Sequence, residues 1–245
     1  MIHDAGPTAQ GHHHPMRSFL MDQVSVKEES ENRPFSIRAA GSAHLRASAN
    51  ILISKRYGWR GYQSSTIPDI ETSDSVTLVA SEKDTTIGTI TIGFDGVNGI
   101  LADELFLDKT DQIRNSGRQI CEFTKLAMDS VNRSKRVLAS LFHVAYIVAK
   151  RVRGADDLLI EVNPRHVGYY HKMLGFKVMS SERNNRRVNA PAVLLCLDLA
   201  WAHDQISRFN HEEGGMEIER SLYPYCFSFE EESRIFHRLK HYAVR

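Results

Sequence analysis

Residues 163–176 read NPRHVGYYHKMLGF and directly follow Leu158–Val162, a short apolar run that we expect to form a strand. Arg165–Leu174 is predicted to be helical, and Gly175 is predicted to end this helix. The segment Phe176–Met179 then begins a further strand. This order of strand, helix and strand predicts a sheet covered by helices, and it guides the interpretation of the rest of the chain.

The preceding segment supplies another strand and a long helix. Arg118–Met128 is β-rich, and its side chains are expected to alternate between two faces. Ser134–Val152 has apolar residues at helical spacing. Strand, helix and strand between 118 and 162 imply a parallel pair joined by a right-handed crossover. One face of the first strand would carry Ile120, Glu122, Thr124 and Leu126, and the other Cys121, Phe123 and Lys125.

The remaining segments predict antiparallel strands and further helices. Ser75–Ala80 and Thr86–Gly93 are β-rich and separated by polar residues, so a hairpin is expected. The fold class is therefore α/β: a mixed, mostly antiparallel sheet with a central parallel pair and helices on both faces. Other predicted elements are a strand at Phe35–Ala39, a helix from Ser42 to Tyr57, a loop with a short helix at Ile100–Ile113, and a strand at Val188–Leu199.

The chain divides into three predicted parts. Residues 1–33 are rich in polar and turn-forming residues, and we expect a flexible tail there with one short helix. Residues 34–199 hold the predicted strands and form the expected domain. Residues 200–245 form an expected C-terminal helical extension.

Composition limits the classes of function. The chain of 245 residues carries 31 Lys plus Arg against 30 Asp plus Glu, a balance that disfavours a general nucleic-acid binder. Its three cysteines form no C-x-x-C pair, which indicates a reducing compartment rather than a disulfide framework. The longest nearly apolar stretch, Val137–Ala149, is too short to span a bilayer, and Met1–Gln10 lacks a signal-peptide pattern. We therefore expect a cytoplasmic protein without a transmembrane segment.

Residues 163–176 resemble the second signature of the GNAT acyltransferase superfamily. In that signature an Asn ends a parallel strand, a helix carries a Tyr, and Leu-Gly-Phe leads into the next strand. The matching residues here are Asn163, Tyr170 and Leu174–Phe176. One extra residue lies between the Tyr and the Leu-Gly-Phe, so counting back from the glycine selects Tyr169 instead. Both tyrosines are therefore candidates for the active-site position.

The other GNAT signature is absent. It is a glycine-rich loop that cradles the pyrophosphate of CoA at a helix N-terminus. The equivalent stretch, 130–139, reads SVNRSKRVLA and contains no glycine. It suits a single phosphate or an acidic protein, such as acyl carrier protein with its phosphopantetheine arm, while a solvated basic turn is the alternative. The candidate donor-binding residues there are Arg133, Ser134, Lys135 and Arg136.

Acyl-homoserine-lactone synthases and long-chain N-acyl amino acid synthases are GNAT-like families that use acyl carrier protein. Residues 121–129, CEFTKLAMD, resemble the fourth-strand motif that both share, and Ile100–Phe106 resembles the segment before it. The run Asn-Pro-Arg-His-x-x-Tyr-Tyr resembles the amino acid synthases more closely. This resemblance, over Phe35–Leu199, implies transfer of a fatty acyl group from the carrier to an amino acid amine, with no resident cofactor or metal. A lactone synthase and a catalytically silent GNAT-like binding module are the alternatives.

The reaction needs a base for the amine and a donor for the thioester oxygen. Glu122 is the candidate base, because a charge in the middle of a predicted core strand is unusual without a role. A structural Glu paired with a nearby Arg is the alternative, and Glu161 is the second candidate base. The resemblance implies that backbone N–H groups near Leu126 and Ala127 bind the thioester oxygen.

The other candidates lie on the predicted helix and in a loop. Tyr170 is the candidate acid for the departing thiolate, although a core aromatic would give the same pattern. Arg165 and His166 are candidates for binding the amino acid's carboxylate, with surface or capping roles as the alternative. Trp59 and Tyr57 are candidates for covering the acceptor's side chain or the acyl chain, or for packing in a satellite core.

Overall fold

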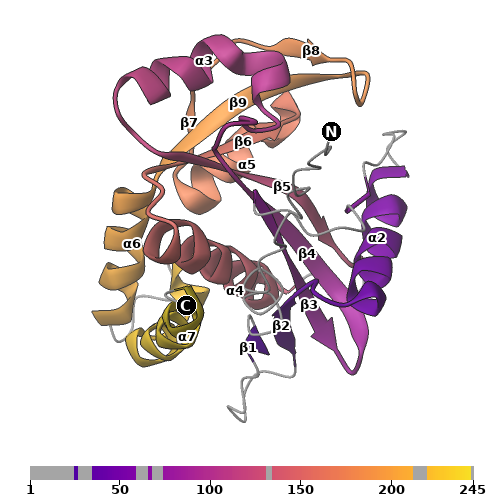
Figure 1. Ribbon diagram of the computed structural model, residues 1–245, viewed down its shortest axis with the longest axis vertical. Coiled ribbons are helices and arrows are strands. Elements are labelled where there is room, and N and C mark those ends of the chain that lie inside the picture. The colour runs from indigo at the N-terminus through magenta and orange to yellow at the C-terminus, as the bar shows by residue number, and fades with distance from the viewer. Residues whose placement is uncertain are drawn as a thin grey trace, which may run out of the picture.

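The computed structural model describes residues 25–26, 35–58, 66–67, 74–130, 134–211 and 220–243. Within them, the sheet runs in the order β1-β2-β3-β4-β5-β6-β9-β7, and β8 pairs with β9 (Figure 1). β5 and β6 are parallel, and the other described pairings are antiparallel. The strands are β1 Ser25–Val26, β2 Ser36–Ala39, β3 Ser75–Glu82, β4 Thr85–Phe94, β5 Ile120–Met128, β6 Asp157–Val162, β7 Lys177–Val178, β8 Arg183–Asn185 and β9 Ala190–Asp198.

Helices cover both faces of this sheet, as the sequence predicts (Figure 1). Leu78 of β3 belongs to the main core with α4, α5, α6 and α7, whereas its neighbour Val79 packs with α2 on the other face. α3 covers that second face over β5, β6 and β9. The helices are α2 Ala43–Gly58, α3 Asp103–Asn115, α4 Lys135–Tyr146, α5 Val167–Leu174, α6 Leu199–His211 and α7 Phe229–Ala243, with short helices η1 Ile147–Val152, η2 Pro164–His166 and η4 Tyr223–Tyr225.

The parallel pair separates soon after it forms. β5 and β6 pair only from Ile120 opposite Asp157 to Glu122 opposite Leu159. Beyond that point β5 continues beside β4, and β6 continues beside β9. The two strands therefore separate, and the sheet opens immediately after Glu122.

A β-bulge in β5 changes which face its last residues occupy. Thr124 lies opposite Thr91, but Ala127 lies opposite Thr89, so β5 has one residue more than β4 in this interval. Lys125 lies within this bulge and has a φ of +50°. The predicted alternation is therefore wrong for Leu126, which packs in the main core instead of on the face of Glu122. The physical reason is that one inserted residue inverts every later position of a strand.

The structure differs from the sequence prediction at three other elements. Ser25–Val26, placed in the predicted tail, pairs with β2; the rest of 1–33 lies outside the described residues. α3 has 13 residues and replaces the expected short helix, because the Asp103 carboxylate accepts hydrogen bonds from Thr110 and Arg114 within it. β8 was not predicted, because its sequence Arg-Asn-Asn has no apolar alternation.

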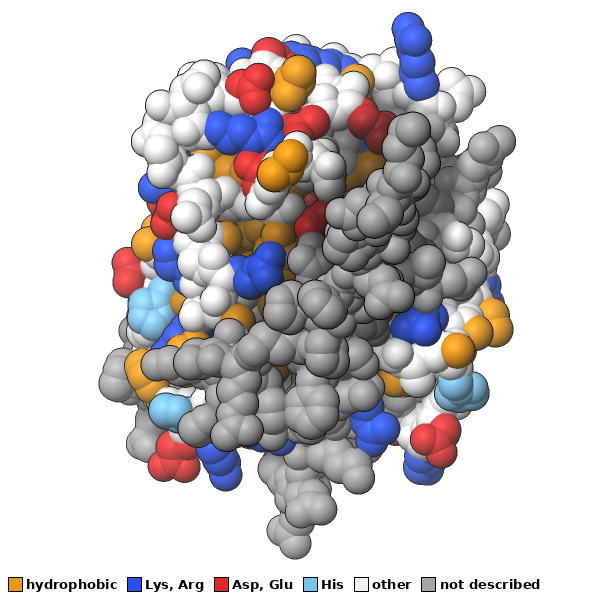
Figure 2. Space-filling model, in the orientation of Figure 1, with side chains coloured by type: hydrophobic (Ala, Val, Ile, Leu, Met, Phe, Trp, Pro, Cys, Tyr) orange, Lys and Arg blue, Asp and Glu red, His pale blue; other side chains and the backbone are white. Residues whose placement is uncertain are grey.

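The C-terminal elements pack directly on the sheet's helices. Leu222, Phe227 and Ile235 are buried in the main core. No helix in the described parts of the chain is long and apolar enough to cross a bilayer. Figure 2 shows Lys and Arg side chains close to Asp and Glu over α3, where Arg183 pairs with Asp108 and Arg114 pairs with Asp103. This mixing of charge agrees with the small net charge of the chain, +1.

Candidate active site

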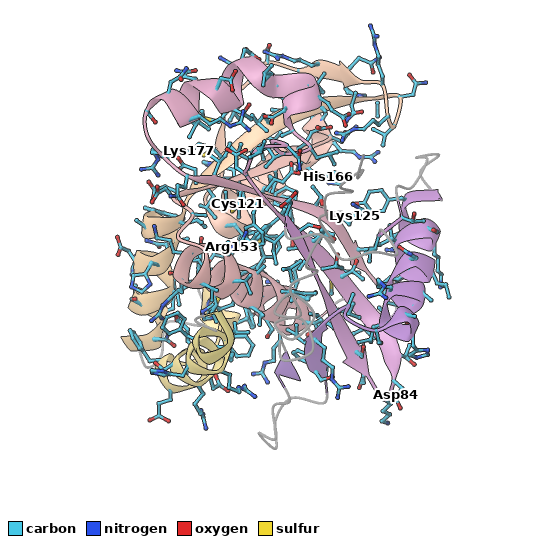
Figure 3. All side chains as sticks on the ribbon, in the orientation of Figure 1. Asp84, Cys121, Lys125, Arg153, His166 and Lys177 are labelled. Atoms are coloured by element: carbon cyan, nitrogen blue, oxygen red, sulfur yellow. The ribbon has the colours of Figure 1, made fainter. Side chains whose placement is uncertain are left out.

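A cavity of about 280 Å³ lies where β5 and β6 separate. It takes residues from several elements that are distant in the sequence, and Figure 3 shows Lys125 and His166 close together on this side of the molecule. Its apolar wall includes Ile90, Phe142 and Ile160, and its polar residues include Glu122, Lys125, Glu161, Asn163, His166, Tyr170, Asn185 and Arg187.

Glu122 lies at this cavity with only 6% of its surface exposed. Its Oε1 accepts a hydrogen bond from the Leu101 N–H at 2.6 Å, and its Oε2 accepts one from the Ala102 N–H at 3.0 Å. These amides lie just before the first turn of α3. Backbone N–H groups at the start of a helix have no acceptor within that helix, so a side chain can bind them. Glu122 is therefore anchored by backbone N–H groups and has no hydrogen bond to an arginine among the described residues.

The surroundings of Glu122 bring the pKa of its carboxyl close to neutral pH. Burial raises the pKa of the Glu122 carboxyl to about 7, against the lowering effect of the two backbone hydrogen bonds. A carboxyl with such a pKa is half ionised near neutral pH, which is the range in which a general base works best.

Glu161, the second candidate base, has both oxygens engaged. Arg187 donates from Nη2 to its Oε2 at 3.0 Å, and Asn185 donates to its Oε1. Burial raises the pKa of Glu161 as well, while Asn185 and Arg187 oppose the shift. The geometry suits Glu161 as a group that positions Arg187.

Of the two residues predicted to bind the thioester oxygen, Leu126 is at the cavity wall and Ala127 is not. Leu126 lines the cavity, and its carbonyl accepts a hydrogen bond from the Tyr57 hydroxyl at 3.5 Å. Ala127 is 2% exposed, is paired with Thr89 and packs toward α2. The bulge thus directs the strand at Leu126 toward the cavity and turns Ala127 away.

η2 and α5, which follow β6, bring His166 and Tyr170 respectively to the cavity. Tyr170 packs edge-on against Phe176 with ring centroids 5.8 Å apart. Tyr169 is 43% exposed and is not part of the cavity wall, so the structure places Tyr170 at the site. Arg165 is exposed and also lies outside the wall, although its Nε donates to His166 Nε2 at 3.3 Å.

The predicted donor-binding residues lie at the start of α4, outside the cavity wall. Ser134, Lys135 and Arg136 are exposed there. Ser134 occupies the N-cap position without a capping hydrogen bond from its side chain. The Lys135 ammonium lies 5.7 Å from the centre of the Tyr225 ring. Arg133 and Trp59 lie outside the described residues.

Polar residues of the cavity that the sequence did not single out as site candidates include Lys125, Asn185 and Arg187. Simple alternation predicts Lys125 on the opposite face of its strand, because the bulge leaves no sequence signal. Asn185 and Arg187 lie in the polar stretch RNNRR, which resembles an ordinary exposed turn. Only the pairing of β8 with β9 brings them to Glu161.

The comparisons with known proteins bear on the family and the fold. The family model described as N-acyl amino acid synthase FeeM matches residues 48–198, more than half of the chain. A search of curated proteins finds no match.

Among solved structures, FeeM, an N-acyl amino acid synthase from uncultured soil microbes, is 24% identical with a TM-score of 0.61, over 69% of this chain and 93% of that one. An acyl-CoA N-acyltransferase from Pseudomonas aeruginosa is 12% identical with a TM-score of 0.47, over 66% and 97%. The CoA-dependent acyl-homoserine lactone synthase MesI is 12% identical with a TM-score of 0.48, over 70% and 90%. The family match shows that this chain belongs to the FeeM N-acyl amino acid synthase family and is an acyltransferase.

Proposed function

We propose that this acyltransferase moves a fatty acyl group from acyl carrier protein to the amine of an amino acid. The observation that carries the proposal is the buried Glu122 carboxyl, with a pKa of about 7, in the cavity between the separating strands. The family supports acyl transfer. The thioester arrives on the carrier's phosphopantetheine arm, so the proposed reaction uses no resident cofactor or metal.

In this mechanism Glu122 accepts a proton from the acceptor's ammonium group, directly or through a water. The neutral amine attacks the thioester carbonyl carbon, and the backbone near Leu126 stabilises the developing oxyanion. The C–S bond then breaks as the amide forms. Tyr170 is the proposed donor of a proton to the departing thiolate. The second proton lost by the nitrogen passes through water to the Tyr170 phenolate, and Glu122 releases the first proton to solvent, so both groups are restored for the next turnover. The products are an open-chain N-acyl amino acid and the free thiol of the carrier.

The cavity supports this division of roles. Its apolar lining residues, among them Ile90, Phe142 and Ile160, suit an acyl chain. Its lining also includes charged residues of both signs, which suit a zwitterionic acceptor. His166 lines the cavity, whereas Arg165 is exposed and is not part of its wall.

The proposed donor follows from the start of α4. The exposed Lys135 and Arg136, with Arg133 beside them in the sequence, offer cations to an acidic carrier. The stretch has no glycine with which to cradle the pyrophosphate of CoA. We therefore expect acyl carrier protein to be a better donor than acyl-CoA at physiological salt.

The first experiment incubates purified protein with acyl carrier protein or CoA loaded with the same acyl chain, and with a panel of amino acids. Mass spectrometry should detect N-acyl amino acids formed from the carrier. Faster transfer from CoA would refute the donor. Release of methylthioadenosine in the presence of S-adenosylmethionine would instead favour a lactone synthase, and the absence of transfer from either donor would favour a silent binding module.

A charge-reversal experiment tests the carrier surface. Lys135→Glu with Arg136→Glu should raise KM for acyl carrier protein and flatten its salt dependence, because screening shortens the Debye length from about 10 Å at 0.1 M to about 3 Å at 1 M salt. Lys172→Glu with Lys177→Glu is the matched control, since both lysines are exposed and outside the cavity wall. Equal effects of the two double variants would remove the start of α4 from the docking surface.

A further inference from the structure

Arg187 has an unusual set of contacts in the turn between β8 and β9. Its Nη2 donates to Glu161 at 3.0 Å, and its Nε lies 3.3 Å from the Glu104 carboxylate. Its third nitrogen, Nη1, is buried and has no hydrogen-bond partner among the described residues. A buried guanidinium nitrogen without an acceptor is costly, so its presence at a cavity indicates a missing acceptor.

The guanidinium is held in place before any acceptor arrives. Asn185, which is 4% exposed, accepts a hydrogen bond from the Arg187 backbone N–H at 2.8 Å through its Oδ1. The Nδ2 of the same side chain donates to Glu161, which in turn holds Arg187 Nη2. Two carboxylates and one amide therefore fix the orientation of Arg187, as expected of a preorganised binding group.

A second cation faces the same space. Lys125, on the bulge of β5, lines the cavity together with Arg187 and Glu122. Burial lowers the pKa of the Lys125 ammonium, and the charge of Arg187 lowers it further against the favourable charge of Glu122. An anion bound near Lys125 and Arg187 would favour the charged form of the lysine.

We propose that Arg187 binds the carboxylate of the acceptor through Nη1, with Lys125 as the second cation, so that the acceptor's amine lies at Glu122. This inference rests on the proposed amino acid acceptor and makes Arg187 a determinant of its specificity. It replaces Arg165 in the binding of the carboxylate, because Arg165 is exposed and is not part of the cavity wall. The enzyme would then select α-amino acids and reject amines that lack a carboxylate.

The test compares acceptors that differ only at the carboxylate. Phenylalanine, phenylalaninamide and phenethylamine are the first matched set, and the same comparison is made for the best acceptor in a panel of the common amino acids. The wild type should prefer the amino acid to its amide and amine by about 10- to 100-fold in kcat/KM, the range of a hydrogen bond to a charged group.

Variants of Arg187 test whether this residue causes the preference for acceptors with a carboxylate. Arg187→Gln should raise KM for the amino acid about 10- to 100-fold while changing kcat/KM for the amine little, so the preference disappears. Arg187→Lys should keep part of the preference, because it keeps the charge without the planar fork. Arg186→Gln is the matched control, since Arg186 is exposed in the same turn and is not part of the cavity wall.

The outcomes separate this inference from the proposed function. If the wild type acylates no amino acid from either donor, the proposed function fails. If it acylates amino acids and the matching amines equally, or if Arg187→Gln keeps the preference, only the inference about Arg187 is wrong. Thermal unfolding of each variant checks the fold; should Arg187→Gln not fold, the wild-type preference and the KM of Arg187→Lys decide the question.

Discussion

At the scale of single residues, Glu122 derives its chemistry from its surroundings. Removal from water favours the protonated carboxyl, while the amides of Leu101 and Ala102 favour the carboxylate. Removal from water is the larger effect, so the pKa of the carboxyl rises to about 7. A lone Glu on an exposed strand would stay ionised throughout that range and would be a weaker base.

Replacing Glu122 tests its role as the general base. Glu122→Gln should keep the fold and lose about 10²- to 10⁴-fold in turnover, the usual loss of a general base. In the wild type, kcat/KM should fall as pH drops below about 7, because the raised pKa protonates the base there. Steady-state kinetics between pH 5 and 9 should show this acid limb in the wild type and its loss in the variant. Unchanged turnover in folded Glu122→Gln would transfer the role to Glu161 or to solvent.

Gly93 has no side chain, and this leaves space for the side chain of Glu122. The two residues are paired across β4 and β5, and a Cβ on Gly93 would lie 2.9 Å from the Glu122 Cγ and 3.0 Å from its Oε1. Gly93→Ala should therefore displace the carboxylate from the Leu101 and Ala102 amides, reduce turnover about tenfold or more, and destabilise the protein by about 1–3 kcal/mol. Gly96→Ala meets nothing within 4 Å and is the control. Equal activity of both variants would contradict this positioning of Glu122.

At the level of helices and strands, the end of α5 depends on Gly175 for two reasons, its backbone conformation and its contact with Trp201. Gly175 has a φ of +78° and ends the helix as predicted, with its N–H bonded to the His171 carbonyl and the next N–H, of Phe176, bonded to the Tyr170 carbonyl. It also lies against the ring of Trp201, which packs edge-on against Tyr223 at 5.9 Å. Glycine is thus needed here for its backbone and for its lack of a side chain.

The two requirements can be separated by two alanine substitutions. Gly175→Ala would strain the backbone and overlap the Trp201 ring, whereas Gly117→Ala has the same φ of +78° with nothing within 4 Å. We expect Gly117→Ala to cost about 1–2 kcal/mol from backbone strain, and Gly175→Ala to cost about 1–3 kcal/mol more from overpacking. Urea unfolding measures both. Similar losses would mean that Trp201 moves aside freely.

At the scale of the whole molecule, a buried polar cluster fastens α7 to α4. His143 Nδ1 accepts the Phe227 N–H at 2.9 Å, so its Nε2 carries the hydrogen that reaches Glu232 at 3.2 Å. Arg151 completes the cluster at the other oxygen of Glu232. Since the Glu232 side chain is only 2% exposed, losing one partner would leave the others buried and unpaired.

The cluster predicts a pH-dependent stability. Burial alone would raise the pKa of Glu232, but hydrogen bonds from His143 and Arg151 outweigh it and hold the pKa below its usual value. The contribution of Glu232 to the free energy of unfolding is therefore fully present above the ordinary pKa of a glutamate. It is lost as the pH falls through the lower pKa that Glu232 has in the folded protein. Glu232→Gln should cost about 3–5 kcal/mol at pH 7 and less in acid, measured by urea unfolding between pH 3 and 7. Glu230→Gln, at an exposed position of α7, should show neither effect.

Much of the architecture follows from local sequence patterns. Alternating apolar residues located β5, helical spacing located α4, and the Asn163–Phe176 stretch located the turn and helix beside the site. Such patterns act over a few residues and depend little on the rest of the chain. The same stretch placed both tyrosines on one helix but left the choice between them open, since their neighbours in space are not encoded locally.

The tertiary structure decided what lies at the cavity. The bulge at Lys125 depends on how β5 pairs with β4, and it moved Leu126 to the other face and brought Lys125 to the cavity. Arg187 reaches Glu161 only because β8 folds onto β9, although the two residues are 26 positions apart in the chain. The physical reason is that strand register and side-chain partners are set by long-range packing, whereas helix and strand periodicity are set by the backbone itself.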